Sequence, residues 1–431
     1  MKQKDLLYFA IFLIFLIGVG WLQSWNVAFG ILNMCLISAI MALGVNIQWG
    51  YAGLFNAGIM GFTALGGLSA VLVSAKPVSE AWAAGGLGII GSLVILGMTV
   101  SAILYVRMKI APPLRTWSII VVILPGYWLF QGFYSSAVEQ IETINPALTG
   151  YLGGLGLPII TAWLIGGLVA AGGAWLIGRI SLGLRADYLA IATLGISEII
   201  IAIIKYEEWL TRGVKNVTGL PRPVPYEVNL IETQWLVNLA ESLSANPVAM
   251  ASLLVKFCYL MLFLGMLAIL MWLSERALKS PWGRMMRAIR DNREAASAMG
   301  KDVTGRHLQT FVLGCAVCGI AGAMLVTLDG QLVPGSYTPL RYTFLIWVMV
   351  ILGGSGNNWG SVLGGCIIWF VWIQAEPLGY ALVEAVTFPF EEGYWLKGHL
   401  IENAAQTRLI LMGGILLVVM RFAPKGLIPE R

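Results

Sequence analysis

Residues 250–273 read MASLLVKFCYLMLFLGMLAILMWL, and this apolar run decides the class of fold to which the chain belongs. A helix needs about 20 apolar residues to cross the roughly 30 Å hydrocarbon layer of a bilayer. Comparable runs repeat along the 431 residues, at 6–22, 28–48, 52–75, 85–106, 117–134, 152–178, 187–204, 308–327, 342–354 with 361–375, and 407–421. The sequence therefore predicts an all-α polytopic integral membrane protein, one domain over residues 1–431 with roughly 10–12 transmembrane segments, some broken or re-entrant.

The composition excludes most other classes of protein. The chain is 58% hydrophobic and 11% charged, whereas a soluble domain carries about 25% charged residues. So few charges cannot cover a water-soluble surface, which excludes a soluble enzyme, a secreted disulfide scaffold and a disordered chain. Residues 6–22 lack an A-x-A-like cleavage site and are followed at once by another apolar run, so we interpret them as a retained first span.

No metal site or cofactor site is predicted within this chain. Cys315 and Cys318 form a C-x-x-C, but no second pair and no nearby histidine completes a ligand set. Residues 86–91, GLGIIG, match G-x-G-x-x-G inside an apolar run, without the preceding strand and later acid of a dinucleotide site. We expect the cysteines and these glycines to be small residues at which helices pack closely.

Charged residues alternate between basic and acidic loops. The basic residues are Arg107, Lys109, Arg115, Arg179, Arg185, then Arg276, Lys279, Arg284, Arg287, Arg290, Arg293, Lys301 and Arg306, and Arg421, Lys425 and Arg431 at the end. The acidic residues are Glu139, Glu142, Glu207, Glu208, Glu232, Glu241, Glu376, Glu384, Glu391 and Glu392. Since basic loops stay in the cytoplasm, we predict that both termini and the loop 274–307 are cytoplasmic and that 205–249 is a periplasmic loop. Residues 342–354 and 361–375 must then enter the membrane and return to the outer side.

Two clusters of glycine interrupt the apolar runs. The first spans residues 50–61 and the second spans residues 353–360. Backbone that leaves helical geometry at membrane depth must be buried in protein or line a water-filled cavity, and paired breaks in two halves of a chain indicate a transport pathway. An ordinary surface turn is the alternative at both places. The pathway candidates at these breaks are Asn46, Gly53, Asn56, Gly353 and Gly354.

Glu198 is the one acidic residue within an otherwise apolar span. It lies eleven residues after Asp187, hence about 17 Å into the membrane at ~1.5 Å per residue. Charges at this depth are costly, and such residues usually face the bundle interior and act in transport. The structural alternatives are a salt bridge to a lysine or arginine of another helix and a side chain that extends outward to the membrane surface.

The cytoplasmic loop carries a distinct helical segment. Residues 283–298 combine alanine and methionine with arginine and glutamate, and Gly300 stands where a helix would end. A short amphipathic helix of this kind fits a groove on another protein. Contact of a basic helix with anionic membrane lipid is the alternative.

Glu294, Ala295 and Ala296, with Gly300 four positions later, resemble the E-A-A---G loop of ABC importer permeases. More narrowly, the chain resembles the permease subunits of branched-chain amino-acid importers and their urea-importing relatives. The similar stretches are ALGVN at 42–46 through GYAG at 50–53, LRADYLAI at 184–191, SPWGR at 280–284 through Gly300, VILGG at 350–354 through 360, and 422–427. Residues 54–59, LFNAGI, and extra apolar segments within 76–180 depart from the family pattern.

The resemblance implies a multi-pass permease of the bacterial inner membrane that is not itself an enzyme. Its implied partners are two cytoplasmic ATPase subunits that hydrolyse ATP, a second homologous permease, a periplasmic binding protein and membrane lipid, with no nucleic acid. Glu294, Ala295, Ala296, Gly300 and Arg290 are the implied ATPase-coupling residues. The implied cargo is branched-chain amino acids, with urea or short amides as alternatives. An ion-coupled secondary transporter using Glu198 and a membrane-embedded enzyme are rival hypotheses.

Overall fold

The computed structural model describes residues 3–145, 149–242, 246–388 and 395–430, and it is almost entirely helical. Ten helices in these ranges are long and apolar enough to cross a membrane, and two shorter apolar helices accompany them. This arrangement confirms the prediction of an all-α multi-pass membrane protein. The long elements are α1 (Gln3–Leu22), α2 (Trp25–Ala52), α3 (Ile59–Ser74), α5 (Leu87–Lys109), α6 (Pro112–Glu142), α7 (Ile159–Ser181), α8 (Ala186–Tyr206), α12 (Pro247–Lys279), α15 (Val303–Asp329), α16 (Pro339–Gly353), α17 (Asn358–Thr387) and α19 (Thr407–Phe422).

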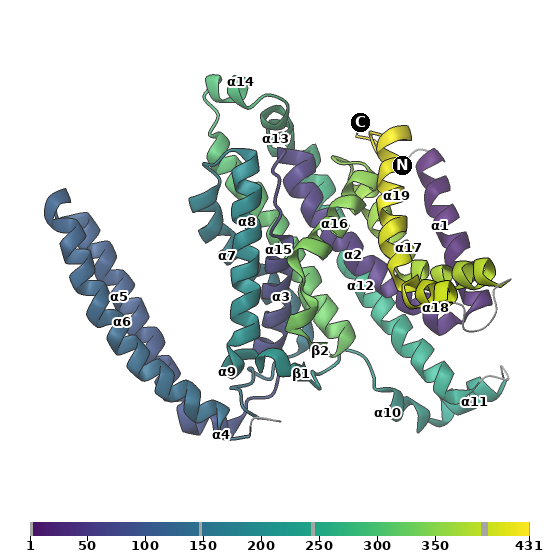
Figure 1. Cartoon of the computed structure of the whole chain (residues 1–431), viewed down its shortest axis with the longest axis horizontal. Coiled ribbons are helices and arrows are strands. Elements are labelled where there is room, and N and C mark those ends of the chain that lie inside the picture. Colours follow the sequence, from purple (N-terminus) through teal and green to yellow (C-terminus); the bar gives the residue numbers. More distant parts are fainter. Residues whose placement is uncertain (1–2, 146–148, 243–245, 389–394, 431) are drawn as a thin grey trace.

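Short elements connect the spans at the two ends of the molecule. At one end lie α13 (Pro281–Asp291), α14 (Arg293–Ala298) and both chain termini, and at the opposite end lie α4, α9, α10 and α11 (Figure 1). The connections there are α4 (Ser79–Ala81), α9 (Glu208–Thr211), α10 (Glu227–Ile231), α11 (Gln234–Ser242) and the paired strands β1 (Val217–Thr218) and β2 (Gln331–Leu332), whereas α18 (Trp395–Glu402) lies between the two ends (Figure 1). We call the α13–α14 end the predicted cytoplasmic face and the other the predicted outer face. Glu391 and Glu392 lie outside the described residues.

The cytoplasmic loop differs from the single helix expected over 283–298. It forms two helices, because Asn292 has extended backbone and its side-chain oxygen accepts a hydrogen bond from the Ala295 N–H at 2.9 Å. Asparagine is a preferred first residue of a helix for this reason. The break at Asn292 separates α14 from α13 and lets the two helices point in different directions.

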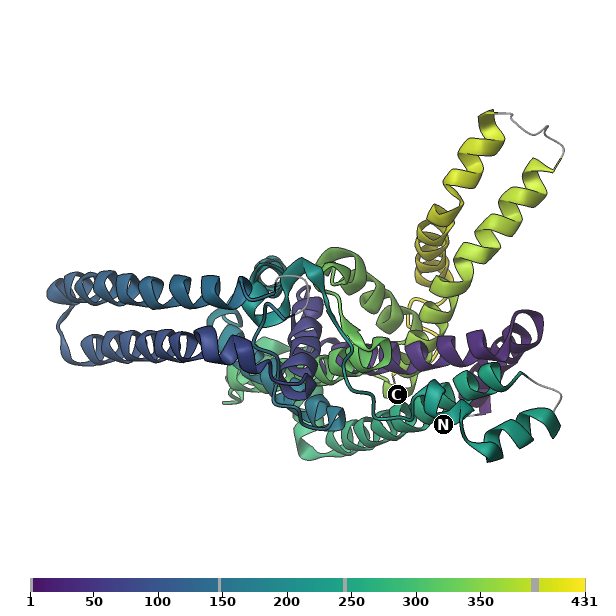
Figure 2. The same cartoon turned by 90° about the horizontal axis from the view of Figure 1, so that it is seen from below.

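The insertion within residues 76–180 forms a separate helical arm. Helices α5 and α6 pack against each other and extend away from the other helices (Figures 1 and 2). At the base of the arm, Tyr134 donates a hydrogen bond to the carboxylate of Glu207, and Trp209 Nε1 donates to the same carboxylate at 2.8 Å. Elsewhere the arm exposes large apolar side chains such as Leu93 and Leu124, which suits contact with lipid.

Small residues bring α2, α3, α7 and α15 together at the centre of the bundle. A Cβ atom at Gly66 of α3 would lie 1.8 Å from the carbonyl oxygen of Gly319 on α15, and one at Gly322 would lie 1.9 Å from that of Thr63 on α3. Backbones approach this closely in membranes only where side chains are absent. The stripe Gly314, Cys318 and Gly322 therefore packs against α2 and α3, and both cysteines of the C-x-x-C are buried.

We predict that Gly66→Ala strongly destabilises the bundle. The added methyl group has no room beside the Gly319 carbonyl, and forced overpacking costs about 1–3 kcal/mol of unfolding free energy. Thermal unfolding of the purified chain in detergent should show a clear drop in midpoint temperature. Gly265→Ala on α12 is the matched control, since nothing lies within 4 Å of its Cβ position. Equal midpoints for both variants would contradict this packing.

Candidate functional site

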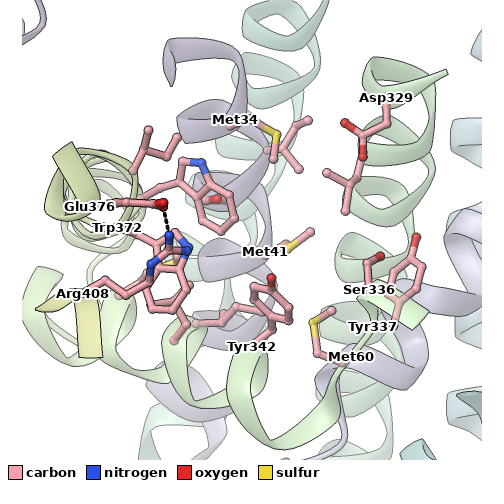
Figure 3. A pocket seen from close by; sticks show the side chains of 18 residues that line it. Met34, Met41, Met60, Asp329, Ser336, Tyr337, Tyr342, Trp372, Glu376 and Arg408 are labelled. Carbon is pink, nitrogen blue, oxygen red and sulfur yellow. Dashed lines mark hydrogen bonds and ion pairs between the residues drawn. The ribbon is translucent and has the colours of Figure 1, made fainter. Parts of the chain in front are cut away.

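A cavity of about 400 Å³ lies among α2, α3, α15, α16, α17 and α19 (Figure 3). Most of its wall is apolar. The flexible or aromatic side chains on the wall are Met34, Met41, Met60, Met349, Tyr337, Tyr342, Trp369 and Trp372. The cavity extends from Asp329, the last residue of α15 at the predicted outer face, toward the middle of α2. Several spans converge on this cavity, as expected of a passage for a small molecule.

Charged side chains stand at the outer part of this cavity. Glu376 of α17 and Arg408 of α19 form an ion pair on one wall, and Asp329 lies on the opposite wall (Figure 3). The Arg408 guanidinium also lies 5.2 Å from the ring centre of Trp372, a cation–π distance. No hydrogen bond or ion pair to Asp329 is found among the described residues. The cavity thus combines an apolar wall with separate positive and negative groups.

Tyr337 adds a neutral hydroxyl to the same wall. It lies between the short 3-10 turn Pro334–Ser336 and α16, and its side chain is buried. Burial, and then the nearby carboxylate of Asp329, raises the pKa of Tyr337 above its ordinary value. The phenol therefore stays protonated at neutral pH and remains a hydrogen-bond donor.

A second polar site joins the cytoplasmic loop to the glycine break after α16, and we call it the inner junction. Asn46 of α2 accepts a hydrogen bond from the Gly356 N–H at 2.8 Å and donates to the Asn358 side chain at 3.0 Å. Tyr51 donates to the same Asn358 oxygen, and Asn358 in turn donates to Glu275 of α12 at 3.0 Å. Three spans and the break are therefore held by one buried network, which is stable only when every polar group is satisfied.

Arg290 of α13 ties the cytoplasmic loop into this junction. Its guanidinium donates to the carbonyl oxygen of Gly50 on α2 and pairs with Glu430 in the C-terminal tail, with Nη1 and Oε2 2.8 Å apart. The Arg290 side chain is 24% exposed. Its guanidinium also pairs with the exposed Asp291, at 3.3 Å, and the expected contact of Arg290 with an ATPase subunit stays a prediction.

The C-terminal tail closes the break at residues 354–357. The N–H groups of Leu427 and Ile428 donate to the carbonyl oxygens of Leu352 and Gly353, at 2.8 and 2.9 Å. Gly354 has φ 113°, and a Cβ there would lie 2.4 Å from the Ile428 oxygen. Only glycine fits both the backbone angle and the space. The tail thus satisfies the carbonyl groups that the end of α16 leaves free.

The first break, between α2 and α3, is also enclosed by protein. Asn56 donates to Gln48 at 2.9 Å and accepts from the Gly58 N–H at 2.8 Å, and Trp347 of α16 donates to the Asn56 carbonyl at 3.1 Å. Gly53 ends α2 in the left-handed conformation, φ 66°. Both breaks are therefore hydrogen-bonded to neighbouring helices and mostly enclosed, although Gly53 itself is exposed.

The predicted coupling residues lie on α14 and the turn after it. Glu294 and Ala295 are exposed, while Ala296 is 9% exposed and packs inward. Gly300 has φ +72° and ends the segment, with its N–H donating to Ser297 O at 2.9 Å. The end at glycine is as predicted, and Figure 1 shows α14 at the extreme of the molecule, where another protein can reach it.

The predicted pathway residues do not line the cavity. Asn46, Gly53, Asn56, Gly353 and Gly354 all lie at the two breaks, toward the predicted cytoplasmic face. Glu198 is exposed on α8, and no partner for it is found among the described residues, so its role stays a prediction. The sequence analysis missed Asp329, Glu376 and Arg408 as site residues because each lies near the end of a span, where charges are common. For Glu376 the available signal was its closeness in sequence to Trp369 and Trp372, and Asp329 and Arg408 had no such signal.

Comparison with known proteins assigns the chain to a family. Residues 137–420 match the family described as branched-chain amino acid transport system / permease component. The probable branched-chain amino acid transport permease LivM of Methanocaldococcus jannaschii is 28% identical over 302 residues, covering 69% of this chain and 74% of that protein. LivM of Escherichia coli K12, a high-affinity branched-chain amino acid transport permease, is 26% identical over 305 residues, covering 70% of this chain but 63% of that protein.

Similarity over a shorter stretch extends to another permease protein of a branched-chain amino acid transport system. LivH of Salmonella typhimurium is 27% identical over 212 residues, covering 49% of this chain and 63% of that protein. No solved structure matches the chain. The family match covers well over half of the residues and includes the cytoplasmic loop, the second break and the part of the cavity wall that comes from α15, α16, α17 and α19. The chain therefore belongs to the permease-component family of branched-chain amino acid transport systems.

Proposed function

We propose that the chain is a translocation subunit of an ATP-binding-cassette importer that carries branched-chain amino acids across a bacterial inner membrane. One observation carries the proposal: a short exposed helix, α14, is joined through α13 and Arg290 to the buried break beside α2 and α16. A force applied to α14 from outside has a direct physical route into the spans. Family membership supports the same role.

The energy source in this proposal lies in partner subunits. The chain contains no G-x-x-x-x-G-K-[ST] segment, the loop that cradles ATP phosphates in P-loop ATPases. Two cytoplasmic ATPase subunits would bind the exposed residues of α14. A second homologous permease would complete the translocation pathway. A binding protein would deliver the solute at the predicted outer face, where the cavity and Asp329 lie.

Transport would proceed by alternating access. Closure of the ATPases displaces α14, and α13 moves with it because the two helices adjoin at Asn292. Arg290 passes this motion to the Gly50 carbonyl at the end of α2 and to the tail that closes the second break. The cavity borders α2 and α16, so a shift of these helices changes its opening.

The cavity wall favours branched-chain amino acids over urea as cargo. Methionine and aromatic side chains cover much of the wall, and an apolar solute that covers this surface gains free energy by removing it from water. Urea has no apolar side chain and would leave this surface unfilled. A leucine side chain would bury apolar area at about 25 cal/mol per Å².

The test is uptake by the complete transporter in liposomes, with binding protein outside and ATP inside. We expect ATP-dependent accumulation of labelled leucine, isoleucine and valine, and no accumulation of labelled urea. Accumulation of urea alone would contradict the substrate assignment. Leucine uptake that needs no ATP and collapses with a protonophore would favour the secondary-transporter hypothesis and Glu198.

A further inference from the structure

We propose that Asp329, Glu376 and Arg408 form a charge-exchange site at the outer part of the cavity, which selects solutes carrying both an ammonium and a carboxylate group. The inference rests on the proposed function for its cargo class, but it concerns how this chain itself recognises that class. It assigns the selection to three side chains of the permease, in addition to any selection by a binding protein.

The ion pair between Glu376 and Arg408 can separate easily. The Glu376 side chain is 42% exposed and that of Arg408 is 22% exposed, so neither charge is locked in the interior. Partly exposed ion pairs contribute little to stability and exchange partners readily. The carboxylate of an amino acid has the same chemistry as that of Glu376, so it can replace Glu376 at the guanidinium.

Arg408 stays in place when its partner leaves. Its guanidinium lies over the Trp372 ring, at 5.2 Å, and the Trp372 side chain is buried. This cation–π contact is independent of Glu376. The positive charge is therefore presented on the cavity wall in a fixed position, as an anion-binding group should be.

Asp329 supplies the complementary group across the cavity. It faces the space from α15 while the ion pair faces it from α17 and α19, and the structure describes no partner for its carboxylate (Figure 3). The guanidinium of Arg341 also lies near this part of the cavity, 4.9 Å from the Trp372 ring, so positive charge gathers on the Trp372 side and Asp329 stands alone as the negative group opposite. This separation of charge across the cavity suits a solute whose carboxylate faces Arg408 and whose ammonium group faces Asp329.

The apolar wall completes the recognition. Met41, Met60 and Ile346 line the cavity beyond the charged part. A solute whose carboxylate contacts Arg408 and whose ammonium group contacts Asp329 would direct its side chain toward these residues. An amine without a carboxylate would lack the contact with Arg408, and a carboxylate without an amine would lack the contact with Asp329.

Arg408 could bind the carboxylate of the solute or only neutralise Glu376, and these two roles predict different effects of substitutions on leucine binding. If Arg408 receives the solute's carboxylate, Glu376→Gln removes an internal competitor and should tighten leucine binding, by up to about fivefold. Arg408→Gln should weaken binding about tenfold or more, and so should Asp329→Asn. If Arg408 served only to neutralise Glu376, the double variant Glu376→Gln/Arg408→Gln would bind leucine as the wild type does.

The experiment measures binding of tritiated L-leucine by scintillation proximity. The chain is purified in gentle detergent with whatever subunits accompany it, without binding protein, and 3-methylbutylamine and 4-methylpentanoate compete. Glu232→Gln, an exposed carboxylate at the predicted outer face, is the matched control. We expect both competitors to be at least tenfold weaker than leucine, with the changes above for each variant.

Three results would overturn this inference: no leucine binding, equal competition by either singly charged analogue, or wild-type binding by the double variant. Failure of the proposed function looks different. If zwitterion binding follows the variants as expected but liposomes show no ATP-driven uptake, the charge-exchange site stands and the importer proposal fails.

Discussion

Replacement of Ala295 by tryptophan is expected to abolish ATP-driven uptake while the chain still inserts and folds. Ala295 is exposed on α14 at the extreme of the predicted cytoplasmic face, so an indole there meets no other part of this chain. A docked ATPase would have to accommodate it. Overpacking a close contact costs about 1–3 kcal/mol, which corresponds to roughly a 5- to 150-fold loss of the docked state.

The measurement is leucine uptake in liposomes together with recovery of the ATPases on the tagged permease. Ala295→Ser is the control, since it changes polarity with almost no added volume and should keep uptake. The neighbouring Ala296 is buried, so a large residue there would disturb the fold as well and would not isolate docking. Full uptake by the tryptophan variant would show that α14 does not seat in a partner.

Replacement of Arg290 by alanine is expected to separate ATP hydrolysis from transport. The variant loses the hydrogen bond to the Gly50 carbonyl and the ion pair with Glu430, the two contacts through which α13 holds α2 and the tail. Hydrogen bonds to charged groups contribute about 1.5–3 kcal/mol, so uptake should fall about tenfold to a hundredfold. Since the described contacts of Arg290 lie within this chain and the exposed residues of α14 are unchanged, ATPase binding and ATP hydrolysis should continue.

Arg284→Ala on the same helix is the matched control. Arg284 is exposed and its one described contact is to the Lys279 carbonyl at 3.3 Å, within the loop itself. We expect this variant to couple hydrolysis to uptake normally. Parallel loss of hydrolysis and uptake in Arg290→Ala would indicate that Arg290 contacts the ATPase, as the family resemblance alone implied. Unchanged uptake would remove Arg290 from the coupling route.

The sequence alone predicts the membrane-spanning helices, because each depends only on the length of a local run of apolar residues. The glycine breaks at 50–61 and 353–360 were also predicted, since glycine and asparagine clusters within apolar runs leave few helical alternatives. The break at Asn292 could have been found as well, because asparagine before a short helix is a familiar capping signal.

The cavity and the direction of Arg290 could not be predicted in the same way. Glu376 and Arg408 are 32 residues apart, and Asp329 is 47 residues from Glu376, so their meeting depends on how whole helices pack. Arg290 is one of several arginines in its loop, and only the position of α13 against α2 turns it inward. Such facts depend on tertiary packing, which the local pattern of polar and apolar residues does not encode.

The central claim is that this permease works as one subunit of an ATP-driven complex. Isolation of the tagged chain from its native membrane in gentle detergent, followed by mass spectrometry of the proteins that accompany it, tests this claim. We predict recovery of P-loop ATPase subunits and a second permease of the same family. Recovery of the chain alone, under conditions that preserve a control importer, would contradict the account.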